Sequence, residues 1–204
     1  MKNTNILKFV KRGFDLIFSI LILPLVIVLV VILGILICAD SRGSVFLRQD
    51  RIGKGGKIFK CVKFRTMFED ADERLDLYLN NNNEAREEWN NYNDPRLTRV
   101  GRFLRKTSLD ELPQIFNVLT GDMSFIGPRP YLPEDKDEVL GFSDLIFLMS
   151  PGITGLWRLS GRNKLNFEDR VKLDSSYVLN WSLWLDIVIL FKTIKVVLNE
   201  ARSY

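Results

Sequence analysis

The sequence predicts an α+β fold: a mainly helical, membrane-associated domain with one small β-hairpin and amphipathic helices at the membrane interface. Three observations support this prediction. Residues 16–39 carry no charge, two strand-like segments flank a glycine-containing turn at residues 51–57, and helical patterns fill most of the remainder. We expect residues 1–40 to form a membrane helix and residues 41–204 to form a single domain.

The uncharged segment is long enough to cross a bilayer, because a helix of about 24 residues covers a hydrocarbon core of roughly 30 Å. Lysine and arginine residues flank it on both sides, and the positive-inside rule assigns both flanks to the cytoplasm. Pro24 resolves this conflict, because an interior proline removes a backbone hydrogen bond and kinks a helix. We expect a re-entrant helix broken at Pro24, with a kinked full span as the alternative. A cleavable signal peptide fits less well.

The two predicted strands, residues 45–47 and 58–65, form a hairpin. Period-two alternation places Lys63 and Arg65 on one face of the second strand. Two neighbouring cations repel each other unless an anion joins them, so this face suits a phosphate group. A solvated charged surface is the alternative.

Residues 69–93 are acidic and rich in asparagine, which indicates a solvent-exposed insertion. Beyond it, Arg96, Arg99, Arg102 and Arg105 recur every third residue and predict a basic ridge on a helix near the membrane surface. A nucleic acid could use the same ridge, but the ridge lacks the interleaved aromatic residues of a base-stacking platform.

Asp110 and Glu111 are adjacent carboxylates at the expected start of a helix. The spacing from Ser108 to Glu111 is that of a capping box, so a structural role is one interpretation. Pro113 favours Asp110 as the cap, because proline is tolerated in the first helical turn. In either register the helix dipole favours an ionised Asp110, as a nucleophile or a magnesium ligand requires.

Arg129 lies between two prolines in the segment 127–130. Each proline fixes its own φ and restricts the residue before it, so the guanidinium is presented by a rigid backbone. A planar, forked cation suits a phosphate better than lysine does. A rigid surface turn is the alternative interpretation.

The composition excludes several chemistries. The chain has no histidine, which rules out an imidazole base, a Ser-His-Asp triad and a histidine-containing zinc site. Cys38 and Cys61 are too few for a disulfide framework, and we expect both to be buried in a reducing compartment. The net charge of +4 fits an anionic partner without identifying it.

Residues 181–198 are apolar but include three charged side chains, which makes a membrane span unfavourable. We expect an in-plane helix with Trp181, Trp184 and Phe191 at the level of the lipid headgroups. A buried core helix is the alternative.

Residues 105–130 closely resemble the catalytic block of the bacterial monotopic phosphoglycosyl transferases, the polyprenyl-phosphate sugar-1-phosphate transferases, because charged, proline and glycine positions match in order. Residues 63–67 and 150–163 resemble further segments of this family. The resemblance covers residues 11–198 and suggests the small form that consists of the catalytic unit alone. One departure concerns the membrane helix: the family commonly has a Ser-Pro pair at the break, whereas Pro24 follows a leucine.

The resemblance implies transfer of a sugar 1-phosphate from a UDP-sugar to undecaprenyl phosphate, with release of UMP, on the cytoplasmic face of the bacterial inner membrane. It implies that Asp110 is the nucleophile and forms a covalent phosphosugar intermediate, and that Asp110 and Glu111 bind Mg²⁺, with Glu111 as an alternative proton-handling group. The substrate- and phosphate-binding residues that it implies are Lys63, Arg65, Arg105, Arg129, Arg162, Asn163 and Asp174.

Two other classes of protein remain open from the residues alone: a membrane-tethered scaffold without activity, and a membrane-attached nucleic-acid binder. Neither uses the adjacent carboxylates beside a rigid arginine, so we expect an enzyme that binds a UDP-sugar and lipid but no nucleic acid. The sequence does not distinguish which sugar is transferred, which glycan is assembled or which oligomer forms.

Overall fold

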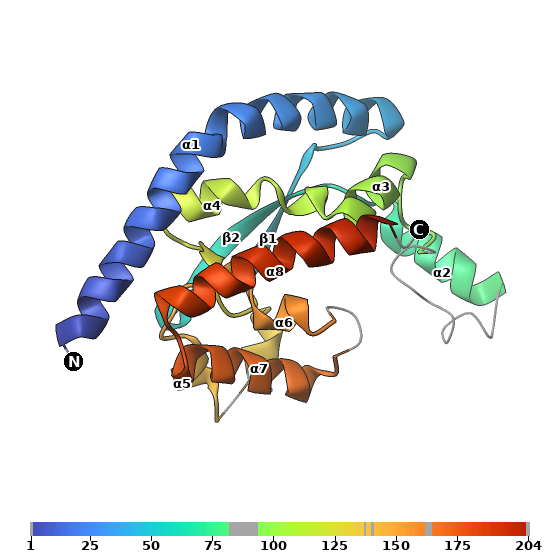
Figure 1. Cartoon of the computed structure of the whole chain (residues 1–204). Helices are drawn as coiled ribbons and strands as arrows, with labels where there is room; N and C mark the ends of the chain where they lie inside the picture. Colours follow the sequence, from blue (N-terminus) through green and yellow to red (C-terminus); the bar gives the residue numbers. More distant parts are fainter. Residues whose placement is uncertain (1, 82–93, 137, 140, 162–164, 203–204) are drawn as a thin grey trace.

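The computed structural model describes residues 2–81, 94–136, 138–139, 141–161 and 165–202 (Figure 1). Two small sheets and several helices form a mixed architecture, which confirms the α+β class. The helices are α1 (Lys2–Asp40), α2 (Ala71–Asn81), α3 (Arg99–Thr107), α4 (Gln114–Thr120), α5 (Ser143–Ile146), α6 (Leu156–Leu159), α7 (Phe167–Leu179) and α8 (Leu183–Arg202). The strands are β1 (Phe46–Ile52), β2 (Ile58–Phe64), β3 (Ser124–Ile126) and β4 (Gly152–Thr154), and 3₁₀ turns occupy Lys54–Gly56, Leu109–Glu111 and Glu134–Lys136.

Helix α1 is one continuous helix of 39 residues that includes Pro24. Figure 1 shows it rising from the N-terminus and then bending to run across the molecule. An interior proline is a usual cause of such a bend. The helix is therefore longer than the uncharged segment and is bent without being interrupted. Insertion as a re-entrant helix stays a prediction.

Much of α1 has an exposed apolar surface. Val26, Leu33 and Ile37 are buried against the rest of the protein. The exposed apolar side chains of α1 include Phe9, Ile17, Leu21, Leu25, Val31 and Ile35. Residues 6–40 are long and apolar enough to cross a membrane. An apolar surface of this extent indicates contact with a lipid or protein partner.

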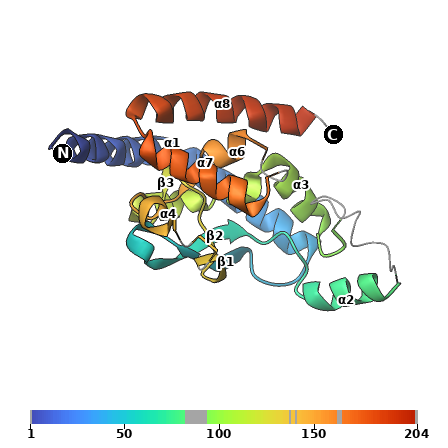
Figure 2. The same ribbon diagram turned by 90° about the horizontal axis from the view of Figure 1, so that it is seen from below.

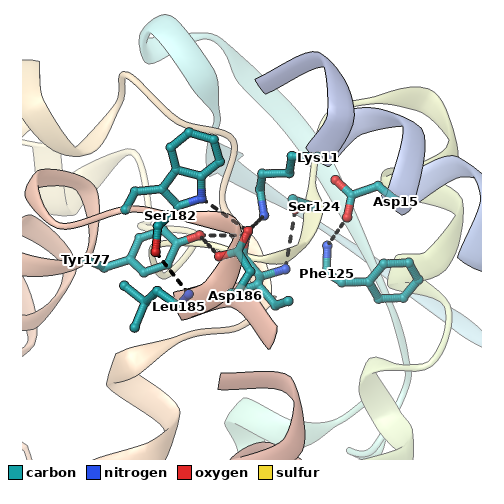
Figure 3. Close-up of polar contacts among 10 residues, drawn as sticks. Lys11, Asp15, Ser124, Phe125, Tyr177, Ser182, Leu185 and Asp186 are labelled. Carbon is teal, nitrogen blue, oxygen red and sulfur yellow. Dashed lines mark hydrogen bonds and ion pairs between the residues drawn. The ribbon is translucent and has the colours of Figure 1, made fainter. Parts of the chain in front are cut away.

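A buried polar cluster fastens the N-terminal part of α1 to α8. The ammonium group of Lys11 lies 2.6 Å from the Asp186 carboxylate, which also accepts a hydrogen bond of 2.6 Å from the Tyr177 hydroxyl (Figure 3). One turn further along α1, the Asp15 carboxylate accepts the backbone N–H of Phe125 at 3.2 Å. These contacts fix the position of α1 relative to β3 and α8.

Strands β1 and β2 form the predicted antiparallel hairpin, in which Leu47 pairs with Lys63 and Ile52 pairs with Ile58. The second sheet was not predicted. It pairs β3 with β4 in parallel, with Ser124 opposite Gly152. This pairing joins two loops that are distant in sequence, one after β3 and one after β4.

The main core lies where α4, β3, α7 and α8 meet. Ile115, Ile126, Tyr177 and Ile189 are buried there together, and Val26 of α1 joins them. A second cluster packs α1 against β2 and α3 through Leu33, Ile37, Phe64 and Leu104. The long apolar helix α1 is thus part of the packed structure.

The predicted basic ridge is only partly present. Helix α3 begins at Arg99, so Arg96 lies before it, and its guanidinium pairs with Asp94 at 2.8 Å. Arg105 donates a hydrogen bond of 3.0 Å to Thr66. Arg99 and Arg102 are exposed. The ridge prediction was wrong for Arg96, because Thr98 caps α3 and starts the helix after it.

Helix α8 presents an exposed apolar face, and Figure 2 shows this helix along one side of the molecule. Trp184 is 71% exposed, and Ile187, Phe191 and Ile194 follow at helical spacing. Trp181 does not belong to this face, because it precedes α8 and its indole N–H donates to Asp186 at 3.1 Å. The geometry suits an in-plane helix that uses Trp184 and Phe191.

The two cysteines differ in exposure. Cys61 is buried, as expected, and burial raises the pKa of its thiol. Cys38 is exposed on α1, so the expectation that it is buried was wrong. Of the predicted insertion, α2 and the residues before it are described, and residues 82–93 lie outside the described part of the chain.

Candidate active site

The adjacent carboxylates lie in a tight turn between α3 and α4. Ser108 ends α3 in the left-handed conformation with φ 56°, and a 3₁₀ turn then carries Asp110 and Glu111. The cap position of α4 is Pro113, which shows that Asp110 is not the helix cap. The capping interpretation was therefore wrong. Asp110 is 7% exposed and Glu111 is 6% exposed, and burying two such groups is costly unless they are compensated.

Glu111 is compensated by two cations. Its Oε2 atom lies 2.6 Å from Nη1 of Arg158, which is itself 4% exposed, and its Oε1 atom lies 3.8 Å from Nζ of Lys63. Arg158 comes from α6 and Lys63 from β2. The carboxylate is therefore held between two elements that are remote in sequence.

A polar cavity begins at Glu111 and is lined by three cationic side chains, those of Arg51, Lys63 and Arg129. Gln114 and Trp157 complete part of its wall. Three cations around one carboxylate leave a net positive charge, and a concave surface concentrates that field. The cavity is small, about 20 Å³, and the charge of its lining suits oxygens of a phosphate group that lies against it.

Arg129 is presented by a rigid segment, as predicted from its flanking prolines. The N–H of Gly127 donates to the Thr154 carbonyl at 2.9 Å, and the N–H of Gly152 donates to the Pro128 carbonyl at 2.8 Å. A Cβ at Gly127 would lie 2.5 Å from a backbone oxygen, so only glycine permits this approach. The Arg129 guanidinium lies over the Trp157 ring at 5.1 Å.

Asp174 lies beneath the Arg129 segment and is fully buried. Its Oδ2 atom accepts the backbone N–H of Arg129 at 3.1 Å and the hydroxyl of Tyr131 at 2.7 Å. Burial raises the pKa of this carboxyl to about 7, although both hydrogen bonds favour the ionised form. Asp174 thus fixes the backbone of Arg129, whose side chain lines the cavity.

Sequence reasoning missed Arg51 and Arg158. Arg51 lines the cavity and donates from Nη1 to the Pro130 carbonyl at 3.0 Å, which links the hairpin to the Arg129 segment. Burial lowers the pKa of its guanidinium. Its position on the same hairpin as Lys63 was a usable signal. For Arg158, the sequence offers no signal beyond its place in a polar, glycine-rich segment.

The structure brings only some of the predicted site residues together. Lys63, Glu111 and Arg129 line one cavity. The Arg65 guanidinium is directed to the carbonyls of Ser41 and Arg42, just after α1. The predicted shared face with Lys63 fails because β2 ends at Phe64, before Arg65. Arg105 contacts Thr66, and Arg162 and Asn163 lie outside the described residues.

The two carboxylates that were expected to bind magnesium lie next to each other in one 3₁₀ turn. Within the described ranges, no group of three or more Asp, Glu, His or Cys residues is arranged to hold a metal ion. The charge of Glu111 is already balanced by Arg158 and Lys63. Mg²⁺ commonly binds through one or two carboxylates plus substrate phosphates.

Taken together, these features define an α+β protein with one long apolar helix and a cationic cavity beside two buried carboxylates. The bacterial sugar transferase family matches residues 6–200 of the chain. The chain belongs to this family, as the resemblance in its central block predicted.

Three relatives illustrate the similarity. The chain is 47% identical to the undecaprenyl-phosphate galactose phosphotransferase of Salmonella typhimurium, over 97% of the chain and 42% of that protein. It is 46% identical to the exopolysaccharide production protein ExoY of Rhizobium meliloti, over 95% of the chain and 88% of that protein. It is 37% identical to the UDP-N-acetylgalactosamine-undecaprenyl-phosphate N-acetylgalactosaminephosphotransferase of Aeromonas hydrophila, over 94% of the chain and 44% of that protein. The chain therefore spans less than half the length of two of these relatives.

Proposed function

We propose that the protein transfers a sugar 1-phosphate from a UDP-sugar to undecaprenyl phosphate and releases UMP. The observation that carries the proposal is the cavity lined by Arg51, Lys63 and Arg129, next to the turn that holds Asp110 and Glu111. The names of relatives that match nearly the whole chain supply the substrate classes. We further propose that the reaction takes place on the cytoplasmic face of the bacterial inner membrane, as the first membrane step of surface glycan assembly.

The chemistry assigned to Asp110 is nucleophilic. A carboxylate oxygen attacks the phosphorus that bears the sugar, the bond from this phosphorus to the bridging oxygen breaks, and UMP leaves with the electron pair. An oxygen of the lipid phosphate then attacks the same phosphorus and releases the carboxylate. Two polyanionic substrates repel each other, and a covalent intermediate allows them to occupy the site in turn.

The surrounding side chains have separate roles in this scheme. Arg51, Lys63 and Arg129 stabilise the charge of the diphosphate and of the leaving UMP. Arg158 holds Glu111 in place, and Asp174 orients the Arg129 backbone. Each of these groups contacts another element, including Lys63 through Glu111, so little reorganisation is needed when the substrate binds.

Mg²⁺ is part of the proposal as a substrate-linked ion. Asp110 and the diphosphate oxygens would hold it, and when bound it would offset the negative charge of the diphosphate. Glu111 is left with its two cationic partners.

Membrane insertion through α1 completes the proposal. Exposed apolar residues cover the outward surface of α1. Helix α8 adds a second exposed apolar face, which includes Trp184 and Phe191. A helix that enters and leaves on one side, bent at Pro24, would place the site at the membrane surface, where a lipid phosphate can reach it.

The transfer assay with an Asp110→Asn variant tests the proposed function. Purified protein in lipid nanodiscs receives undecaprenyl phosphate, Mg²⁺ and a panel of UDP-sugars that begins with UDP-galactose, and UMP release is measured. The wild type should release UMP with at least one donor, and Asp110→Asn should release none above background. Asp144→Asn, which changes an exposed aspartate, is the matched control and should act as the wild type does. A fully active Asp110→Asn variant would exclude the nucleophile, and a wild type inactive with every donor would favour a scaffold.

A further inference from the structure

A second cavity, of about 260 Å³, lies between α1 and α8. Its apolar wall includes Ile22 and Val26 of α1 and Leu190 and Val197 of α8. It is therefore a mostly apolar space between the two helices that carry the largest exposed apolar faces.

This apolar cavity and the cationic cavity share part of their walls near the turn that carries Asp110 and Glu111. Glu111 and Ile153 line both cavities, and Ser108 and Arg158 also line the apolar one. A molecule with an apolar tail in this space could have its polar head beside Glu111.

The cavity wall is continuous with the surfaces that face outward. On α1, the lining residue Ile22 has the exposed residue Leu25 three positions further along; on α8, the lining residue Leu190 has the exposed residue Ile187 three positions before it. A hydrocarbon chain from a bilayer could enter between the helices while remaining in contact with apolar groups, which avoids the cost of exposing it to water.

Arg158 provides the polar end with an unused donor. Its Nη1 atom binds Glu111, whereas its buried Nε atom has no hydrogen-bond partner among the described residues. An unsatisfied buried donor is costly, and a phosphate oxygen is the strong, charged acceptor that it lacks.

We infer that the apolar cavity binds the acceptor lipid, with the isoprene units nearest the phosphate between α1 and α8 and the phosphate at Arg158, next to Glu111. The inference rests on the proposed function. The space is too small for a whole polyprenyl chain, so the remainder of the chain lies in the bilayer. The donor diphosphate then lies against the small cationic cavity and the lipid phosphate approaches from the apolar one, with Glu111, which lines both, between them.

Filling the cavity from α8 tests this inference. Val197→Trp places a large side chain in the lining, and Ile194→Trp, one turn away on a face that is 52% exposed, is the matched control. We expect Val197→Trp to raise the KM for undecaprenyl phosphate by about tenfold or more, because even one added methylene group in an apolar pocket can have an effect of this size. UMP release by the donor half-reaction, without acceptor, should stay at the wild-type level in both variants.

A second measurement uses the unaltered protein and a series of prenyl phosphates of increasing length. The KM should fall over the first few isoprene units and then level off once the cavity is filled. A KM that does not depend on chain length would overturn the inference, as would an unchanged KM in Val197→Trp. If the KM for the acceptor is unchanged in Val197→Trp but the dependence of its activity on the phospholipid of the nanodisc is altered, the cavity binds a structural lipid instead. Failure of the proposed function is distinguishable, because the wild type would then release no UMP at all.

Discussion

Glu111 is the residue on which the site converges, because it lines both cavities and binds Arg158 and Lys63. A buried carboxylate is stable only while its charge is compensated. The orientation of the turn that carries Asp110 therefore depends on α6 and β2, which supply the two cations.

Replacing Arg158 with methionine tests this dependence. The variant keeps much of the side-chain volume but leaves buried Glu111 with Lys63 at 3.8 Å. We expect the free energy of unfolding to fall by about 3 kcal/mol, measured by chemical denaturation in detergent. Arg102→Met removes an exposed arginine and should change stability by less than about 0.5 kcal/mol. Equal stability of the two variants would refute the compensating role of Arg158.

Asp174 predicts a pH dependence of stability. Its pKa is raised from 3.8 to about 7 in the folded protein, so the folded state retains a proton that the unfolded state loses. The Asp174 contribution is fully present below the unfolded pKa and is lost as the pH rises through the folded pKa. Asp174→Asn should therefore gain stability relative to the wild type between about pH 4 and pH 7. Unfolding curves across this range measure the difference; parallel pH profiles would contradict the shifted pKa.

The chemistry of individual residues could be predicted where it depends on a short motif. The adjacent carboxylates and the arginine between two prolines were recognisable, because their neighbours in sequence define them. Arg51 and Arg158 were not, since their roles arise from contacts with Pro130 and Glu111, which are distant in the chain. The predicted capping role of Asp110 was wrong because Leu109–Glu111 form a 3₁₀ turn before α4, whose cap position is Pro113.

At the level of elements, close backbone contact joins α3 to the segment after β2. Gly101 of α3 approaches Thr66, and a Cβ at Gly101 would lie 1.9 Å from the Thr66 carbonyl oxygen. Thr66 also accepts a hydrogen bond from Arg105. The packing of α3 therefore requires glycine at this position.

Gly101→Ala should lower the free energy of unfolding by roughly 1–3 kcal/mol or more, because the backbone must shift to admit the methyl group. Gly13→Ala is the control: it also lies in a helix, with no atom within 4 Å of the added Cβ. This change should leave stability unchanged or raise it by up to about 1 kcal/mol. Thermal unfolding in detergent distinguishes them, and a Gly101→Ala variant as stable as Gly13→Ala would show that α3 is free to move.

Local patterns predicted the elements better than their ends. Alternation identified the hairpin, and apolar content identified α1 and α8. The parallel pairing of β3 with β4 could not be predicted, because each strand has three residues and they are joined only in the folded chain. The prediction that Trp181 lies at the membrane-facing surface was wrong, because its indole N–H donates to Asp186 and the ring does not join the exposed face of α8.

For the whole molecule, the membrane arrangement decides whether the site can meet both substrates. Cysteines introduced at Lys8 and Arg42, on either side of the apolar segment, report this arrangement in a Cys38→Ser background. A re-entrant α1 predicts that a membrane-impermeant maleimide labels both positions in inside-out vesicles and neither in right-side-out vesicles. Labelling from opposite sides would establish a full span and remove the membrane part of the proposal.

The apolar helix α1 is not a separate anchor, because it contacts Phe125 and Asp186 in the rest of the protein. Composition indicated a membrane element, but its packing against the remainder depends on Lys11 and Asp15, two charged residues that lie before or at the edge of the apolar segment. Their partners could be identified only from the structure.

The central claim is that Asp110 forms a covalent bond to the sugar-bearing phosphorus. The most direct measurement incubates the protein with a UDP-sugar labelled at that phosphate, without lipid acceptor, and locates the label by peptide mapping. We predict labelled Asp110 with an equal amount of released UMP, label loss in Asp110→Asn, and transfer of the label to lipid when undecaprenyl phosphate is added. Complete transfer to lipid with no labelled protein at any time would contradict the account.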